Sequence, residues 1–266
     1  MMLTDFLPTT KKECQLRGWD ELDVILFSGD AYVDHPSFGA AVIGRTLEAH
    51  GYKVAIVPQP DWHGDFRDFK KLGKPRLFFG ISPGAMDSMV NKYTARKRLR
   101  SEDAYSPDGR HDCRPEYPTI VYTKILKELF PDIPVVLGGI EASMRRLTHY
   151  DYWQDKLMPS VLVSSGADLI TYGMGEKATI ALCETPREEW HNIPQTVFLT
   201  DSIKSQDDDI ILHSHEECLK DKRSQAENFR HIEEESNKMH ASRLIQQVGE
   251  KYVVVNAPYP PMTTAE

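Results

Sequence analysis

Small, polar and charged residues stand at the ends of five short apolar runs in this sequence, and their types suit ligand binding. Glycine lets a ligand approach the backbone closely, while hydroxyl, carboxylate and guanidinium groups orient it through hydrogen bonds. If the runs are parallel strands, these residues meet in one crevice at the carboxyl edge of a sheet. The candidate crevice residues are Ser28, Gly29, Asp30, Gly80, Ser82, Gly138, Gly139, Glu141, Arg145, Gly173, Gly175 and Glu176.

Each of these glycines, taken alone, is also explained by a tight turn between a strand and a helix. Five strand ends together predict a crevice without identifying its occupant. Glu141 and Arg145 are one helical turn apart, which predicts an ion pair inside or beside the crevice. A salt-bridged scaffold around the same crossover explains that pair equally well.

The stretch GDAYVDHPSFG, residues 29–39, holds an adjacent Asp34 and His35. One interpretation makes His35 an axial ligand of a cobalt corrinoid, oriented by the neighbouring carboxylate. The other places Pro36 at the first position of a helix that Asp34 caps. The cobalamin signature has aspartate two residues before histidine and glycine three after it, whereas here the offsets are one and four. We therefore favour the cap.

Two further clusters are open to more than one interpretation. His111, Asp112 and Cys113 are zinc-ligand types, but adjacent residues rarely bend onto one ion and no second pair follows at finger spacing. We expect a solvated loop and no metal site. The basic run contains Lys92, Arg96, Lys97, Arg98 and Arg100, with Tyr93 available to stack on a base. A solvated helix face paired with nearby acids is the favoured interpretation, and an RNA-contacting surface is the alternative.

The sequence lacks the nucleotide-binding motifs and the cysteine spacing of several enzyme classes. Neither GxGxxG nor GxxxxGK[ST] occurs, which disfavours a dinucleotide dehydrogenase or a P-loop nucleotidase. The four cysteines, Cys14, Cys113, Cys183 and Cys218, are far apart and form no CxxC. We expect reduced thiols, with neither an iron–sulfur cluster nor a structural zinc in this stretch.

The secondary-structure elements that position these residues can be predicted from the sequence, in which apolar runs, turns and amphipathic segments alternate. The runs are rich in Val, Ile, Leu and Phe, as strands covered on both faces are. Amphipathic helices are predicted over 37–50 and 117–130. The pattern predicts an α/β fold with a doubly wound, flavodoxin-like or cobalamin-binding-like parallel sheet of about five strands in the order 2-1-3-4-5. The five runs are 23–29, 52–60, 75–82, 133–141 and 167–176.

The remaining segments predict appendages to this sheet. We expect a Rossmann-type domain over 1–185 with an insertion near 84–114, and an extension over 186–256. That extension is predicted to contain one long charged helix, 220–248, and an isolated strand, 251–256. The proline-rich residues 257–266 are predicted to begin a linker.

Charge and hydropathy limit the partners and the location. The formal net charge of -8 and pI near 5.7 argue against a protein that mainly neutralises phosphate backbones. No stretch approaches the roughly 20 apolar residues that cross a bilayer. The first lysines follow the initial apolar piece, the reverse of a signal peptide, so we expect a cytoplasmic protein without a membrane partner.

Several long stretches of the sequence carry a family resemblance. The chain resembles, from Trp19 to its end, the amino-terminal part of the YgiQ-like radical S-adenosylmethionine (SAM) proteins. The stretches are GDAYVDHPSFGAAVIGRTLEAHGYKVAIVPQPDW, RLFFGISPGAMDSMVNKYTARKRLRSEDAYSPDG, VVLGGIEASMRRLTHYDYWQDK and ADLITYGMGE.

This resemblance implies a multidomain parent protein. It implies a cobalamin-binding-like domain followed by a radical SAM barrel, in which a CxxxCxxC motif binds a [4Fe–4S] cluster that cleaves SAM to a 5′-deoxyadenosyl radical. That motif is absent here. We therefore expect an accessory domain that has no catalytic residue or cofactor of its own and whose partners are the parent's barrel and an unidentified substrate. A cobalamin-binding module and an RNA-contacting domain are the alternatives.

Overall fold

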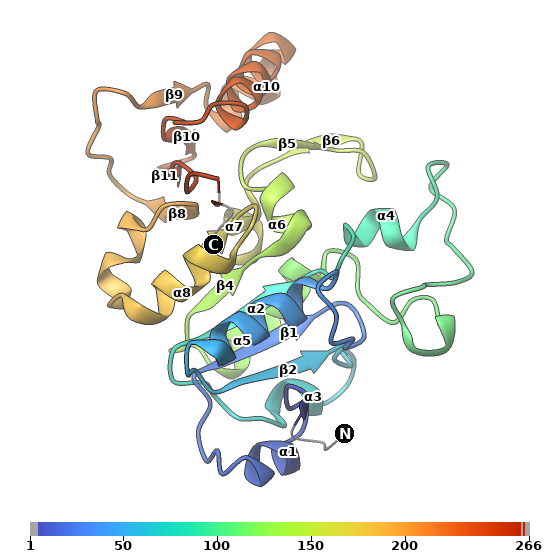
Figure 1. Cartoon of the computed structure of the whole chain (residues 1–266). Coiled ribbons are helices and arrows are strands. Elements are labelled where there is room, and N and C mark those ends of the chain that lie inside the picture. The colour runs from blue at the N-terminus through green and yellow to red at the C-terminus, as the bar shows by residue number, and fades with distance from the viewer. Residues whose placement is uncertain (1–4, 262, 264–266) are drawn as a thin grey trace.

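A nine-stranded sheet forms the centre of the computed structural model, which describes residues 5–261 and 263 (Figure 1). The strand order is β2-β1-β3-β4-β7-β8-β11-β10-β9. Its first five strands are parallel and follow the predicted order. The doubly wound α/β class is thus confirmed, although the described residues form nine strands in this sheet rather than about five. The parallel strands are β1 (Val24–Ser28), β2 (Val54–Pro58), β3 (Phe78–Ser82), β4 (Val135–Leu137) and β7 (Leu169–Thr171).

Alternating apolar side chains give the parallel sheet a core on each face. In β1, Val24 and Leu26 belong to one buried cluster, and Ile25 and Phe27 belong to the other. This is the alternation of a strand covered on both sides. Helices α2 (Gly39–Ala49) and α8 (Glu176–Glu184) pack together over the first face, and the second face is covered by α3 (Arg67–Lys70), α5 (Pro118–Leu129) and α7 (Val161–Ser165).

The predicted helix ends are close to those observed, with one informative difference. The helix predicted over 117–130 is confirmed as α5. The first crevice helix begins at Gly39, so Pro36 lies before it rather than at its first position. Its N-cap residue, Phe38, has an extended backbone and makes no side-chain capping bond. The apolar run predicted over 133–141 ends as a strand at Leu137, because a short helix already begins at Gly139.

The C-terminal extension widens the same sheet (Figure 1). The prediction of one helix over 220–248 is wrong, because α10 ends at Ser236 and Leu244 and Ile245 are buried in a strand. That strand pairs with its successor through a hairpin turn at Gly249, whose φ of +60° suits glycine. The extension comprises η3 (Arg187–Asn192), β8 (Thr196–Thr200), β9 (Ile210–Leu212), α9 (His215–Lys220), α10 (Lys222–Ser236), β10 (Leu244–Val248) and β11 (Lys251–Val255).

Irregular segments follow the carboxyl ends of β3 and β4. The long insertion after β3 holds two short helices and two isolated bridges, Tyr93–Leu99 and Glu102–Arg110. No helix in the described part of the chain is long and apolar enough to cross a membrane. The remaining elements are α1 (Lys11–Leu16), α4 (Ser88–Lys92), η2 (Pro107–Gly109), α6 (Gly139–Met144), β5 (His149–Asp151) and β6 (Lys156–Met158).

Candidate functional site

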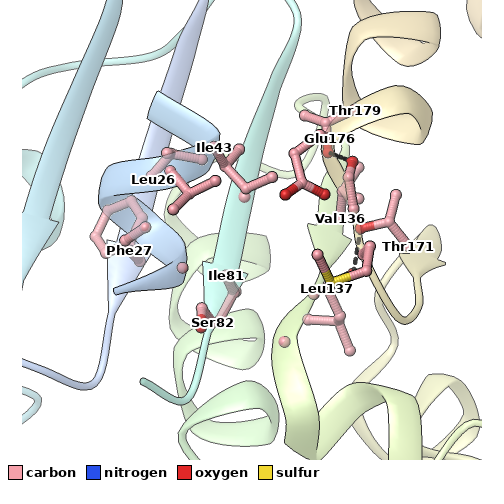
Figure 2. Close-up of a pocket in the computed structure, with 18 of the residues that line it drawn as sticks. Leu26, Phe27, Ile43, Ile81, Ser82, Val136, Leu137, Thr171, Glu176 and Thr179 are labelled. Atoms are coloured by element: carbon pink, nitrogen blue, oxygen red, sulfur yellow. Dashed lines mark hydrogen bonds between the residues drawn. The ribbon is translucent and has the colours of Figure 1, made fainter. Parts of the chain in front are cut away.

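A cavity of about 280 Å³ lies between α2, α8 and the sheet, at the carboxyl ends of the parallel strands. Its floor comes from β1, β3 and β4, and its sides come from the two helices (Figure 2). Seven predicted crevice residues line it, which are Gly80, Ser82, Gly138, Gly139, Gly173, Gly175 and Glu176.

The glycines of this cavity leave room for the chain to fold tightly around it. Gly139 has a φ of +79°, and a Cβ atom there would lie 2.9 Å from Ser82 Oγ. Gly173 has a φ of +67°. Both positions therefore favour glycine for backbone reasons, as the tight-turn interpretation expects. The same lack of side chains leaves peptide groups at the surface of the cavity.

Glu176 supplies the carboxylate of the cavity. It is the first residue of α8, where a negative charge is stabilised by the helix dipole. Its Oε2 atom is buried and has no hydrogen-bond partner among the described residues. Figure 2 shows the carboxylate directed from α8 into the space opposite Ile43 of α2.

The other five predicted residues lie outside this cavity, in two buried polar clusters. Ser28, Gly29 and Asp30 belong to the first, where the insertion meets the end of β1. The Arg114 guanidinium lies 2.8 Å from Asp30 and 2.9 Å from Asp103, and all three residues are buried. Burial raises the pKa of Asp30 despite this guanidinium. Asp103 is also buried, but hydrogen bonds and the Arg114 charge outweigh that effect and lower its pKa.

Glu141 and Arg145 belong to the second buried cluster. The predicted ion pair between them is present at 3.9 Å, and Arg145 also pairs with Asp87. Ser88 and Thr119 donate their hydroxyl groups to the Glu141 carboxylate, which is completely buried. Burial raises the pKa of Glu141. These residues fasten α6 to α4 and α5, so the pair lies beside the cavity rather than in its wall.

The side chains of Asp34 and His35 bind different partners. The Asp34 carboxylate binds Arg45 of α2, whose guanidinium lowers the pKa of that carboxyl, and it does not cap the helix as predicted. The exposed His35 accepts a hydrogen bond from the Ser37 backbone at Nδ1, 3.1 Å away. The Asp34 carboxylate is therefore not the group that orients His35. A cobalamin ligand at His35 stays a prediction.

Some side chains of the remaining two candidate clusters bind other parts of the protein. Asp112 pairs with Lys92 at 2.6 Å, within the loop expected at residues 110–113. The basic run is not a helix face as expected, because α4 ends at Lys92 and the chain then turns back at Lys97, which has a φ of 58°. Arg100 donates to the carbonyls of Val90 and Tyr93. The RNA-contacting alternative remains a prediction.

Cysteine chemistry does not fit an iron–sulfur cluster in this chain. Cys14 is buried in α1, which lies near the β2 end of the sheet (Figure 1). Cys218 is buried in α9, which packs on β10 near the other end. Cluster ligands are thiolates, yet burial raises the pKa of Cys183 to about 12 and that of Cys218 to about 11. Among the described residues, no group of three His, Cys, Asp or Glu side chains could hold a metal ion.

Several site residues were missed by reasoning from the strand ends. Thr179 lies one turn after Gly175 in α8, and Ile43 lies on the sheet-facing side of α2; only the helix periodicity could have indicated them. Arg114 lies in the long insertion after β3, where no local pattern indicates which strand end it contacts. Thr171 is the last residue of β7 and could have been found by extending the same strand-end reasoning.

A doubly wound parallel sheet with a cavity at the carboxyl ends of its strands places the chain among the open α/β domains. Within that class, the chain belongs to the family described as Radical SAM N-terminal, whose model matches residues 6–266.

Curated relatives extend this assignment. A UPF0313 protein of Bacteroides thetaiotaomicron is 66% identical over 99% of this chain and 46% of its own length. One from Porphyromonas gingivalis is 64% identical over 99% of this chain and 43% of its own length. One from Geobacter sulfurreducens is 46% identical, covering 98% of this chain and 44% of its own length. The chain therefore spans less than half the length of these relatives. No solved structure matches it.

Proposed function

We propose that this chain is the accessory domain of a radical SAM enzyme, in which it positions the substrate or covers the catalytic barrel. The [4Fe–4S] cluster and the cleavage of SAM belong to the other part of the longer relatives. The observation that carries this proposal is the contrast between a cavity at the strand ends and cysteines that do not converge. Membership of the Radical SAM N-terminal family supports this reaction class.

Anaerobic iron–sulfur reconstitution of two proteins tests this division of labour. The first protein is this chain, and the second is the full-length Bacteroides thetaiotaomicron relative. Each is supplied with SAM and a strong reductant, and 5′-deoxyadenosine is measured. We expect the brown chromophore of a cluster and 5′-deoxyadenosine from the full-length relative alone.

Two outcomes contradict the proposal. Cluster formation followed by SAM cleavage in this chain would make it catalytic by itself. Absence of both from the reconstituted full-length relative would remove the radical SAM reaction class. A variant of this chain in which all four cysteines are serine is the matched control, because adventitious iron sulfide forms without cysteine ligands.

A further inference from the structure

The lining of the cavity between α2 and α8 is mostly apolar, and three of its polar side chains can accept hydrogen bonds from a ligand. Thr171 donates its hydroxyl proton to the Leu137 carbonyl at 3.4 Å, and Thr179 donates to the Gly175 carbonyl at 2.7 Å. These two hydroxyl oxygens have only lone pairs left to offer a ligand. Glu176 adds a carboxylate whose buried Oε2 has no hydrogen-bond partner among the described residues.

An unpaired carboxylate oxygen in an apolar cavity favours a ligand that donates to it. Leaving a buried acceptor unsatisfied costs free energy, and the dipole at the start of α8 offsets this cost without supplying a donor to Oε2. A ligand with an N–H group would provide the missing hydrogen bond, and this bond would be strengthened by the charge of Glu176.

Size and surface shape restrict the ligand further. At about 280 Å³, the cavity lies just below the range of roughly 300–1,000 Å³ in which drug-sized ligands bind. One fused ring system fits this space, whereas a corrin macrocycle or a dinucleotide does not. The floor from Leu26, Gly80 and Val136 and the bare peptide groups of Gly138 and Gly175 form surfaces on which a planar ring can lie.

We propose that this cavity binds a planar nitrogen heterocycle that carries an amino or ring N–H donor, and that Glu176 accepts that donor. The heterocycle is a free ligand or one ring of a larger molecule that extends past Pro36 and Ser37, two exposed residues of the cavity lining. This inference rests on the proposed function, in which the cavity positions a substrate, and it adds the chemical class of the ligand. Its test involves no cluster and no SAM, so its failure is distinguishable from failure of the radical SAM assignment.

Two probes of matched size measure the contribution of the N–H donor. 2-Aminobenzimidazole carries donors, and 1-methylbenzimidazole carries none. We expect calorimetry to give at least about tenfold tighter binding of the amino probe, as a charge-assisted hydrogen bond provides. The substitution Glu176→Gln removes the negative charge but keeps an acceptor oxygen, so it should weaken this preference. Glu184→Gln, at the exposed end of the same helix, retains it.

Glycine-selective ¹⁵N labelling locates the bound probe. Six of the 16 glycines line the cavity, so their amide signals should shift, whereas those of Gly18, Gly51 and Gly64, which are not part of its lining, should not. Circular dichroism of Glu176→Gln verifies that the variant is folded. The cavity glycines are Gly39, Gly80, Gly138, Gly139, Gly173 and Gly175.

Four results overturn the inference. They are no binding of the amino probe, equal affinity for both probes, an affinity that Glu176→Gln leaves unchanged, and shifts confined to glycines outside the cavity.

Discussion

At the scale of single residues, Arg114 is the side chain whose loss should harm the protein most. It is 1% exposed, pairs with both Asp30 and Asp103, and donates to the Pro83 carbonyl at 3.0 Å. Replacing it by methionine keeps much of the volume but leaves two buried carboxylates without their cation. We expect Arg114→Met to lower the free energy of unfolding by about 3–5 kcal/mol. Urea denaturation measures this loss.

The matched control for that change is a surface arginine with one carboxylate partner. Arg67 pairs with Asp65 at 3.1 Å, and its side chain is 82% exposed. Solvent screens this pair, so Arg67→Met should have no measurable effect on the urea midpoint. Equal losses for the two variants would show that the buried cluster around Arg114 contributes nothing special.

At the scale of elements, the end of β1 is fixed by a close approach to the insertion after β3. A Cβ atom on Gly29 would lie 2.0 Å from the Pro83 carbonyl oxygen, which is backbone and cannot turn aside. Gly29→Ala should therefore lower the free energy of unfolding by about 1–3 kcal/mol, the usual cost of overpacking. Gly39→Ala is the control, because a Cβ atom there meets nothing within 4 Å. Thermal unfolding should separate the two variants, and equal midpoints would contradict the predicted clash.

The elements also show what sequence patterns can and cannot predict. The five parallel strands were predictable because each is a short apolar run followed by a turn, and this signal is local. The segment 220–248 was not, because the charged residues of α10 continue without a proline or glycine into LIQQV, whose strand state depends on pairing with β11. Distant pairing overrides local propensity there.

At the scale of the whole molecule, some candidate site residues were also predictable from the sequence and others were not. Strand order alone brought Gly138, Gly175 and Glu176 to one cavity, since parallel strands end at one edge. It could not predict that Asp30 and Glu141 would instead be covered. Their partners come from the insertion after β3 and from α4 and α5, and no spacing in the sequence indicates those contacts.

Two histidines lie at the junction between the C-terminal extension and the segment after α6, on either side of Thr148. His215 is buried and His149 is half-buried. His149 of β5 donates from Nδ1 to the Leu147 carbonyl, 3.1 Å away, and His215 of α9 lies 3.0 Å from the Thr148 hydroxyl. Thr148 also donates its backbone N–H to Gln246 of β10 at 2.8 Å. Burial lowers the pKa of both histidines, and the Arg145 charge lowers that of His149 further.

The two histidines should make the folded protein less stable in acid. As pH falls below 6.5, the ordinary pKa of histidine, His149 and His215 bind protons in the unfolded chain but stay neutral in the folded protein. Stability therefore falls with pH until the lowered folded pKa values are reached, by at most about 1.4 kcal/mol per pH unit for each histidine. The raised pKa values of Asp30 and Glu141 act in the opposite direction as pH falls.

A difference measurement isolates the histidines from those carboxyls. Urea unfolding of the natural chain and of the double variant His149→Gln, His215→Gln is compared from pH 7.5 to pH 5. Lost packing shifts the whole curve of the variant, whereas lost titration changes its slope. We expect the natural chain to lose stability more steeply below pH 6.5 than the variant does, since Asp30 and Glu141 contribute equally to both. Parallel curves would mean that these two histidines bind protons equally in the folded and unfolded chain.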